Sequence, residues 1–143
     1  RDYAMACDGQ TVMAMGSASR FYRSTNGTSW DILGGGGAPA YVDVRDAVAA
    51  GGAFVFVGQS GGGNIAATYD NGATFQRITI PQLDAILRIE VDGNTWVASG
   101  IGNVTPSESL VFVSTDRGQT WTPSEMPFTP GSSATAIAVC IKP

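Results

Sequence analysis

Short runs of mostly apolar residues along the chain end at polar turns. Examples are "TVMAMG" (11–16), "AFVFVGQ" (53–59) and "LVFVST" (110–115), each bounded by Gly, Asp, Asn or Ser. No apolar spacing of 3.6 residues persists for ten residues anywhere in the chain. The pattern therefore predicts many short β-strands and almost no helix.

Three segments of the chain repeat one plan of strands and turns. Each contains two apolar strands joined by a two-residue turn, a variable loop, a third strand, a polar turn that ends in an aromatic residue, and a fourth strand. The two-residue turns are Asp8-Gly9, Gly51-Gly52 and Asp92-Gly93, which start 43 and 41 residues apart. Such pairs favour hairpins, since primed turns need positive φ. Four strands per 40–50 residues is the period of a β-propeller blade.

The repeat predicts the position of every strand. Expected inner strands are 3–7, 46–50 and 86–91, second strands 10–15, 53–58 and 95–99, third strands 20–24, 65–69 and 109–114, and fourth strands 29–33, 74–79 and 120–123. We expect an all-β fold in which blade 1 covers about 1–38, blade 2 about 39–82 and blade 3 about 83–130.

The end of the chain resembles its beginning. "TAIAVCIKP" is similar to "YAMACDGQ" (3–10), so residues 134–142 are expected to form the first strand of a fourth blade. Known propellers close with about four to eight blades, so three blades make a partial ring. We expect the missing blades to come from the rest of a longer chain, or otherwise from other copies in a homo-oligomer.

The three polar turns carry a recognisable motif. They read "STNGTSW" (24–30), "TYDNGATF" (68–75) and "STDRGQTW" (114–121). The third resembles the Asp-box, or BNR repeat, of sialidase-like β-propellers, whose pattern is Ser-x-Asp-x-Gly-x-Thr-Trp. The second departs from it at two positions, and the first is one residue shorter with Asn for Asp. The residues assigned to the boxes are Ser24, Asn26, Gly27, Trp30, Thr68, Asp70, Gly72, Phe75, Ser114, Asp116, Gly118, Thr120 and Trp121.

The chemistry of these boxes favours a structural role. A short carboxylate or amide accepts hydrogen bonds from the N–H groups of its own turn, and the aromatic residue buries its ring. A calcium loop is disfavoured, because each turn holds at most one carboxylate. The resemblance implies that the boxes lie between third and fourth strands, on the face opposite the ligand site.

Ligand contacts are therefore expected in the loops at the other end of the blades. These loops join second to third strands and connect successive blades, and they differ in length, as binding loops often do. The candidate binding residues are Arg20, Tyr41, Asn64, Asn103 and Glu108.

Several classes of function are disfavoured by composition. The net charge is −4 without a basic cluster, which argues against nucleic acid. The chain has no histidine and no apolar run long enough to span a bilayer. We predict neither a metal nor a cofactor. The two cysteines, Cys7 and Cys140, fall at equivalent inner-strand positions and are expected to be buried free thiols.

A sialidase needs an arginine triad, a Tyr–Glu pair and an acid/base aspartate, and these cannot be assigned here. "QRITIP" (76–81) is the segment nearest to the Arg-Ile-Pro motif of that family, but two residues separate its Arg-Ile from Pro81. We therefore expect no catalytic residue within the chain. The alternative is that the chain is a fragment of a sialidase-like glycoside hydrolase whose catalytic residues lie on other blades.

The sequence thus favours a non-catalytic recognition or scaffold module that binds a glycan or a protein surface. Composition and degenerate repeats are reminiscent of phage tail and receptor-binding proteins, which suggests an extracellular or virion-surface location. A further alternative is a protein-assembly factor of the photosystem-assembly type, because such factors also use Asp-box propellers.

Overall fold

The computed structural model describes residues 3–16, 20–33, 43–59, 64–103 and 109–124, and these ranges contain strands and turns but no helix. The strands are β1 (Ala4–Cys7), β2 (Val12–Gly16), β3 (Arg20–Ser24), β4 (Asp31–Leu33), β5 (Asp43–Ala50), β6 (Ala53–Gln59), β7 (Ile65–Thr68), β8 (Gln76–Ile78), β9 (Leu83–Asp92), β10 (Thr95–Gly102), β11 (Ser109–Ser114) and β12 (Thr122–Pro123).

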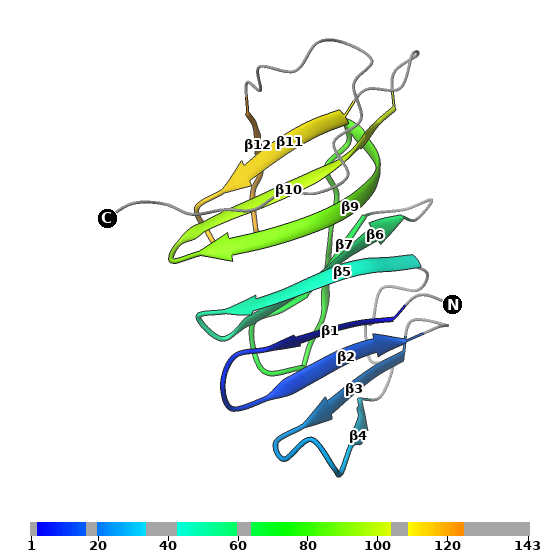
Figure 1. The fold of residues 1–143 in the computed structure, drawn as a ribbon, viewed down its shortest axis with the longest axis vertical. Coiled ribbons are helices and arrows are strands. Elements are labelled where there is room, and N and C mark those ends of the chain that lie inside the picture. The colour runs from blue at the N-terminus through cyan, green and yellow to red at the C-terminus, as the bar shows by residue number, and fades with distance from the viewer. Residues whose placement is uncertain (1–2, 17–19, 34–42, 60–63, 104–108, 125–143) are drawn as a thin grey trace.

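The strands form three antiparallel four-stranded units in chain order. β1–β4 form the first unit, β5–β8 the second and β9–β12 the third. The second and third units are joined by a single pairing of Gln59 with Ala85. Figure 1 shows the units one above the other, with the inner strands β1, β5 and β9 in sequence along the stack. The predicted all-β propeller architecture is confirmed, and the strand predicted over 134–142 lies outside the described residues.

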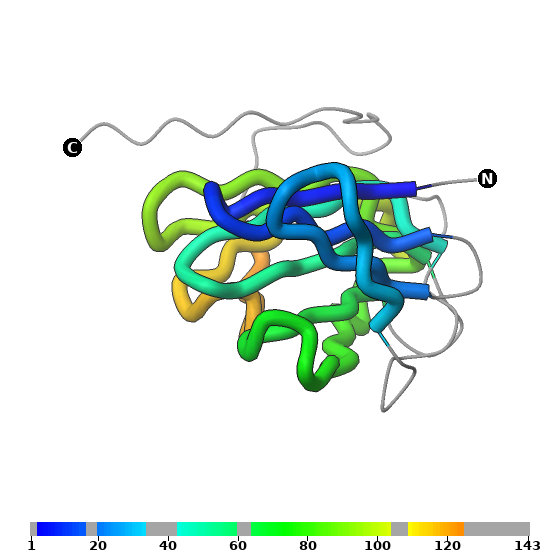
Figure 2. The backbone as a smooth tube through the Cα atoms, turned by 90° about the horizontal axis from the view of Figure 1, so that it is seen from below, coloured from blue at the N-terminus to red at the C-terminus, as the bar shows by residue number. Residues whose placement is uncertain are grey.

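The inner strands lie on one side of the molecule and the outer strands on the other. Seen end-on in Figure 2, β1, β5 and β9 follow the upper side, while β8 and β12 lie toward the lower side. The outer strands β4, β8 and β12 are only two or three residues long. Short outer strands leave little unpaired backbone at the edge of each blade.

The inner strands of blades 2 and 3 start earlier than the sequence pattern predicts. β5 begins at Asp43 and β9 at Leu83, instead of 46 and 86. In β5 the register shifts so that Val44 pairs with Gly58 and Asp46 with Val57, which leaves Arg45 as the extra residue of a β-bulge. Such a bulge interrupts the alternation of apolar and polar residues. The first residues of the strand therefore do not follow the sequence pattern expected of a strand.

Glycine is required on β6 and β10 where the register of the neighbouring inner strand shifts. A Cβ atom built on Gly58 would lie 1.9 Å from the backbone oxygen of Asp43. One built on Gly100 would lie 2.1 Å from the backbone oxygen of Ala85. The two glycines stand 42 residues apart, so the same close backbone approach recurs in blades 2 and 3.

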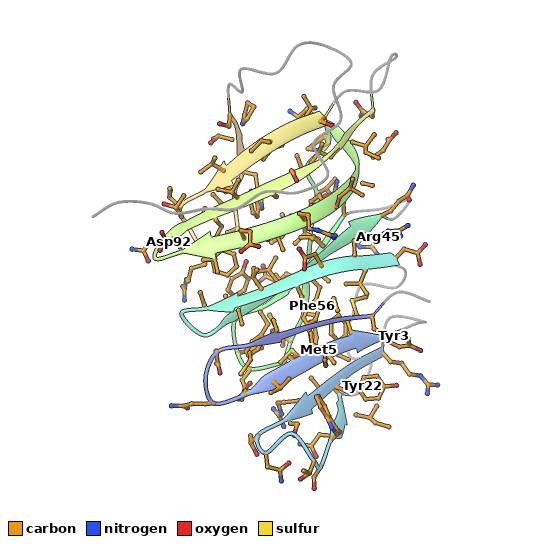
Figure 3. All side chains as sticks on the ribbon, in the orientation of Figure 1. Tyr3, Met5, Tyr22, Arg45, Phe56 and Asp92 are labelled. Atoms are coloured by element: carbon orange, nitrogen blue, oxygen red, sulfur yellow. The ribbon has the colours of Figure 1, made fainter. Side chains whose placement is uncertain are left out.

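The core lies between the blades, because the facing sides of neighbouring blades are apolar and form two buried clusters. We call the face of a blade that points toward the preceding blade its incoming face, and the face toward the following blade its outgoing face. Phe21, on the outgoing face of blade 1, stacks on Phe75 with ring centroids 3.9 Å apart and meets Phe56 edge-on at 5.3 Å. Figure 3 shows Phe56 between the ribbons of blades 1 and 2.

The second contact between blades has the same construction. The outgoing face of blade 2 and the incoming face of blade 3 form one buried aliphatic and aromatic cluster. Its members include Val55, Val57, Ile65, Ile86, Ile89, Trp96 and Phe112. Burial of these side chains stabilises the fold by about 1.5–3 kcal/mol each, so the contacts between blades supply most of the apolar burial.

A methyl group at the bulge glycine should be costly. Gly58→Ala forces the new Cβ against the Asp43 backbone, so we expect a loss of about 2 kcal/mol or more in the free energy of unfolding. Urea denaturation followed by tryptophan fluorescence measures this loss. Gly100→Ala should behave similarly, while Gln59→Ala, at an exposed neighbour, should change stability by less than about 0.5 kcal/mol. Equal stability of Gly58→Ala and the native chain would contradict the assigned close approach.

Candidate functional site

Each blade has two ends with different chemistry. The β1–β2, β5–β6 and β9–β10 hairpins lie at the same end as the polar turns that follow β3, β7 and β11, because neighbouring strands are antiparallel. We call this the box end. The loops after β2, β6 and β10, and the links from one blade to the next, lie at the opposite loop end.

The turn after β11 is held by its own side chains. Asp116 accepts backbone hydrogen bonds from Gln119 (3.1 Å) and Thr120 (2.9 Å), and its second oxygen accepts the Thr120 hydroxyl at 2.5 Å. Ser114 donates to Asp116 at 2.7 Å and accepts the N–H of Gly118 at 2.9 Å. These contacts occupy both carboxylate oxygens, so Asp116 serves the turn.

The other two turns repeat this arrangement. Asp70 accepts the backbone N–H of Thr74 at 2.9 Å and the Thr74 hydroxyl at 2.6 Å, and Thr68 donates to it at 2.9 Å. In the shorter first turn, the amide oxygen of Asn26 accepts the N–H groups of Thr28 (2.9 Å) and Ser29 (2.8 Å). The repeated function of the short polar side chain is to accept hydrogen bonds.

Turns two and three also bind the preceding blade. Asn71 and Arg117 occupy equivalent positions with φ of 57° and 62°, unusual for residues other than glycine. The carbonyl of Asn71 accepts Nη1 of Arg23 at 2.9 Å. The carbonyl of Arg117 accepts the hydroxyl of Tyr69 at 3.2 Å. The left-handed conformation therefore turns a carbonyl toward the previous blade.

Arg117 adds two further contacts across the same boundary. Its Nη1 donates to the backbone oxygen of Gly51 at 3.2 Å, and its guanidinium lies 5.9 Å from the centre of the Tyr69 ring. Burial, with a smaller contribution from the nearby Asp116 charge, raises the pKa of Tyr69 to about 12. Tyr69 thus remains a neutral hydrogen-bond donor at physiological pH, which suits a structural clamp.

The carboxyl groups of the turns are held in the charged form. Hydrogen bonds from the side chain and backbone of Thr74 lower the pKa of Asp70 to about 2. Partial burial opposes this change at Asp116, but hydrogen bonds led by the Thr120 hydroxyl lower its pKa to about 2 as well. A general acid for glycoside hydrolysis needs a raised pKa instead. The box end is therefore poorly suited to acid catalysis.

At the loop end, the Asn64 side chain is buried and forms structural hydrogen bonds. It is 2% exposed, and its amide nitrogen donates to the backbone oxygens of Ile80 and Leu83, both at 3.0 Å. Its amide oxygen accepts the N–H of Ile80 at 3.0 Å. Asn64 was predicted as a ligand contact, but burial and three hydrogen bonds assign its amide to fixing the link between β8 and β9.

Of the other predicted contacts, Arg20 and Asn103 are exposed at the loop end. Asn103 donates to the backbone oxygen of Pro81 at 2.7 Å, and its own N–H donates to Gln82 at 3.1 Å. Tyr41 and Glu108 lie outside the described residues. Three of the five predicted contacts thus lie at the predicted end, and Arg20 is the most open of them to a ligand.

Further exposed side chains lie on the rim of this end. Arg45, the bulged residue of β5, is exposed, and Figure 3 shows it on the side of β5 that faces β9. Tyr3, 42 residues earlier, is 61% exposed, and Ile101 on β10 is 38% exposed. The sequence analysis assigned none of the three to the site. Gly16, Gly58 and Gly100 recur every 42 residues, as do Tyr3 and Arg45. This spacing is the sequence signal from which equivalent rim positions in successive blades could have been predicted.

Cys7 corrects one prediction made from the sequence. Its thiol is free, but the residue is exposed instead of buried. The reason is its position on the incoming face of blade 1, against which no described blade packs. Cys140 lies outside the described residues.

The described residues provide no metal centre and no membrane helix. Within those ranges, no group of three or more Cys, Asp or Glu side chains is placed to hold a metal ion. No helix long and apolar enough to cross a membrane occurs in the same ranges.

Comparison with known proteins identifies the fold. No family model matches the chain, and no curated protein matches it. Solved structures are similar to the chain, among them two of YCF48. "YCF48 bound to D1 peptide" has a TM-score of 0.56 and 21% identity over 85% of this chain and 40% of that chain. YCF48 from Cyanidioschyzon merolae has a TM-score of 0.51 and 16% identity over 87% of this chain and 43% of that one. The chain therefore has the β-propeller fold and spans less than half the length of either structure.

The lowered pKa values predict how stability depends on pH. Asp70 and Asp116 have pKa values near 2 in the folded state against 3.8 ordinarily, so their stabilisation is complete above about pH 4 and is lost toward pH 2. In urea denaturation across that interval, the Asp70→Asn, Asp116→Asn double variant should lose less stability than the native chain. Asn26→Asp should lose more, because it adds a third titrating group. Identical pH profiles for all three proteins would contradict this account.

The three hydrogen bonds of the Asn64 side chain predict that its removal lowers the free energy of unfolding strongly. Asn64→Ala leaves buried backbone groups of Ile80 and Leu83 without partners, which should cost about 2–3 kcal/mol. Asn103→Ala is the matched control, since its side-chain bond is exposed, and it should cost less than about 1 kcal/mol. Equal losses in urea denaturation would show that Asn64 has no special role in the loop.

Proposed function

We propose that this chain is a non-catalytic propeller module that binds a segment of a partner protein at its loop end. The observation that carries the proposal is the rim itself, where exposed Arg20 and Arg45 lie on strands β3 and β5 and exposed Tyr3 directly precedes β1. Sites built on strands are held more precisely than sites on loops.

The chemistry of the rim suits a polypeptide. Arginines provide charge and planar hydrogen-bond donors, while Tyr3 and Ile101 provide apolar contact at 61% and 38% exposure. Arginine and tyrosine are enriched where proteins bind one another. Asp43 and Asp84, which are also exposed at this end, supply acceptors for a partner's N–H groups or basic side chains.

Two other observations support the proposal. The box end is occupied by hydrogen bonds that hold the turns and the blades together, which leaves the loop end for recognition. One of the similar solved structures is YCF48 bound to a D1 peptide. The glycan partner and the extracellular or virion setting remain predictions from the sequence.

The proposal can be tested with an unbiased peptide library. Selection of random 12-residue peptides displayed on phage against the native chain should enrich binders. An Arg20→Ala, Arg45→Ala variant should bind the selected peptides at least tenfold more weakly in biolayer interferometry, because it removes two charged donors from the rim.

Arg77→Ala is the matched control, since Arg77 is exposed on the outer strand β8, at the opposite edge of blade 2 from the inner strand β5 that carries Arg45. Its affinity should equal that of the native chain. A library that yields no binder, or binders that tolerate the rim variant, would contradict the proposal. Binding on a glycan array without any peptide binding would favour the glycan alternative instead.

A further inference from the structure

The first box turn, which joins β3 to β4 (Figure 1), is one residue shorter than the other two. In the second turn, Asn71 separates the box carboxylate of Asp70 from Gly72. The first turn lacks this intervening residue, so the box side chain of Asn26 directly precedes Gly27. The shorter turn thus places a side-chain amide next to the backbone nitrogen of a glycine.

An asparagine that precedes a glycine can react with the backbone of its own chain. The backbone nitrogen of the glycine attacks the side-chain carbonyl carbon, and water later opens the five-membered imide to aspartate or isoaspartate. Glycine favours this attack, because it has no side chain in the way and adopts backbone conformations that other residues avoid. Gly27 has such a conformation, with a φ of 73°.

The hydroxyl of Ser24 connects the two groups that would react. Ser24 Oγ accepts the N–H of Gly27 at 2.8 Å and donates to Oδ1 of Asn26 at 3.2 Å. A hydroxyl that accepts one proton and donates another can move a proton from an attacking nitrogen to a carbonyl oxygen while the new bond forms. The two contacts therefore make a proton path within the turn.

The side-chain carbonyl of Asn26 is polarised by backbone donors as well. Its Oδ1 accepts the N–H groups of Thr28 at 2.9 Å and Ser29 at 2.8 Å. Negative charge develops on this oxygen during the attack, and N–H groups that already point at it stabilise that charge, as in an oxyanion hole. The donors that hold the turn together thus also favour reaction at Cγ of Asn26.

The second turn contains the same dipeptide in a different arrangement. Asn71 also precedes a glycine, and the N–H of Gly72 donates to Thr68 Oγ1 at 2.9 Å. The Thr68 hydroxyl, however, donates to Asp70 at 2.9 Å. The proton path of this turn therefore leads to a carboxylate and not to the side chain of Asn71. The two Asn-Gly pairs of the chain form an internal comparison.

An acidic product would fit the first turn. Asp70 and Asp116 stand at the equivalent position and accept the same kind of backbone hydrogen bond as carboxylates. Asp70 is exposed although its turn packs against a preceding blade. Water therefore reaches the box position of a turn even where another blade comes before it.

We propose that Asn26 is a self-modification site, at which the first box turn converts its own asparagine to an aspartyl residue. The Gly27 nitrogen bonds to Cγ of Asn26, while its proton passes to Ser24 Oγ and the Ser24 proton passes to Oδ1. The Cγ–Nδ2 bond then breaks, the proton on Oδ1 moves to the leaving nitrogen, and ammonia departs. One water molecule opens the imide. The site lies at the box end, so this proposal and that of peptide binding at the loop end can fail separately.

Peptide mapping by mass spectrometry, after incubation of the folded chain near neutral pH, tests the proposal. In the native fold Asn26 should convert about tenfold faster than Asn71 or more, because only its turn combines the proton path with the polarising donors. In concentrated urea the two rates should become similar, since both asparagines then precede glycine in an unfolded chain. Asn26→Asp provides the reference for the aspartate product. Equal rates at the two asparagines in the native fold overturn the proposal.

Two variants test the role of the Ser24 hydroxyl. Ser24→Ala removes the proton path and should slow conversion of Asn26 about tenfold or more. Ser24→Thr keeps a hydroxyl, which Thr68 carries at the equivalent position of the second turn, and should convert at nearly the native rate. Circular dichroism verifies that each variant is folded. Conversion of Asn26 in folded Ser24→Ala that is as fast as in the native chain, or faster, also overturns the proposal.

Discussion

The fold depends on the packing of one blade against the next. A four-stranded antiparallel unit that is apolar on a single face can rest on a helix or another sheet, but here the middle blade is apolar on both faces. Phe54 and Phe56 point toward blade 1, whereas Val55 and Val57 point toward blade 3, and all four are fully buried. The uninterrupted apolar run of β6 has this cause, since both sides of the strand face a neighbour. Blade 2 therefore has no stable form without its neighbours.

The polar turns are part of the same constraint. A turn that only closed a hairpin would require hydrogen bonds within itself, as Asp116 and Asp70 provide. The turn after β7 also places Phe75 on Phe21 of blade 1 and directs the carbonyl of Asn71 to Arg23 of that blade. The turn after β11 directs the carbonyl of Arg117 to Tyr69 of blade 2. The turn at Asn26 lacks the residue whose carbonyl makes this contact, and it is the turn with no described blade before it. The box motif is thus a device for joining blades as well as for reversing the chain.

The sequence predicts the strands well and the rim poorly, for identifiable physical reasons. Strand and turn positions follow from alternation and from Asp-Gly or Gly-Gly pairs, which are local properties of the chain. The bulge at Arg45 is not local, because it exists only through the close approach of Asp43 to Gly58 on the next strand. The role of Asn64 likewise depends on residues that are distant in sequence. An asparagine in a Gly-rich loop looks like a surface residue, and only the return of residues 80–83 beside it turns its amide inward.

The box end and the loop end of the blades are stabilised by different groups. At the box end, side-chain oxygens are consumed by backbone N–H groups of the turn, so a ligand would have to displace bonds that hold the blades together. At the loop end, the comparable structural bonds are made by backbone atoms and by the side-chain amides of Asn64 and Asn103, while Arg20 is exposed on β3. Substitution of an exposed rim side chain should therefore cost little stability, whereas substitution in a box changes stability first. The surface at the loop end can thus vary in sequence without change to the propeller frame, because the two depend on different residues.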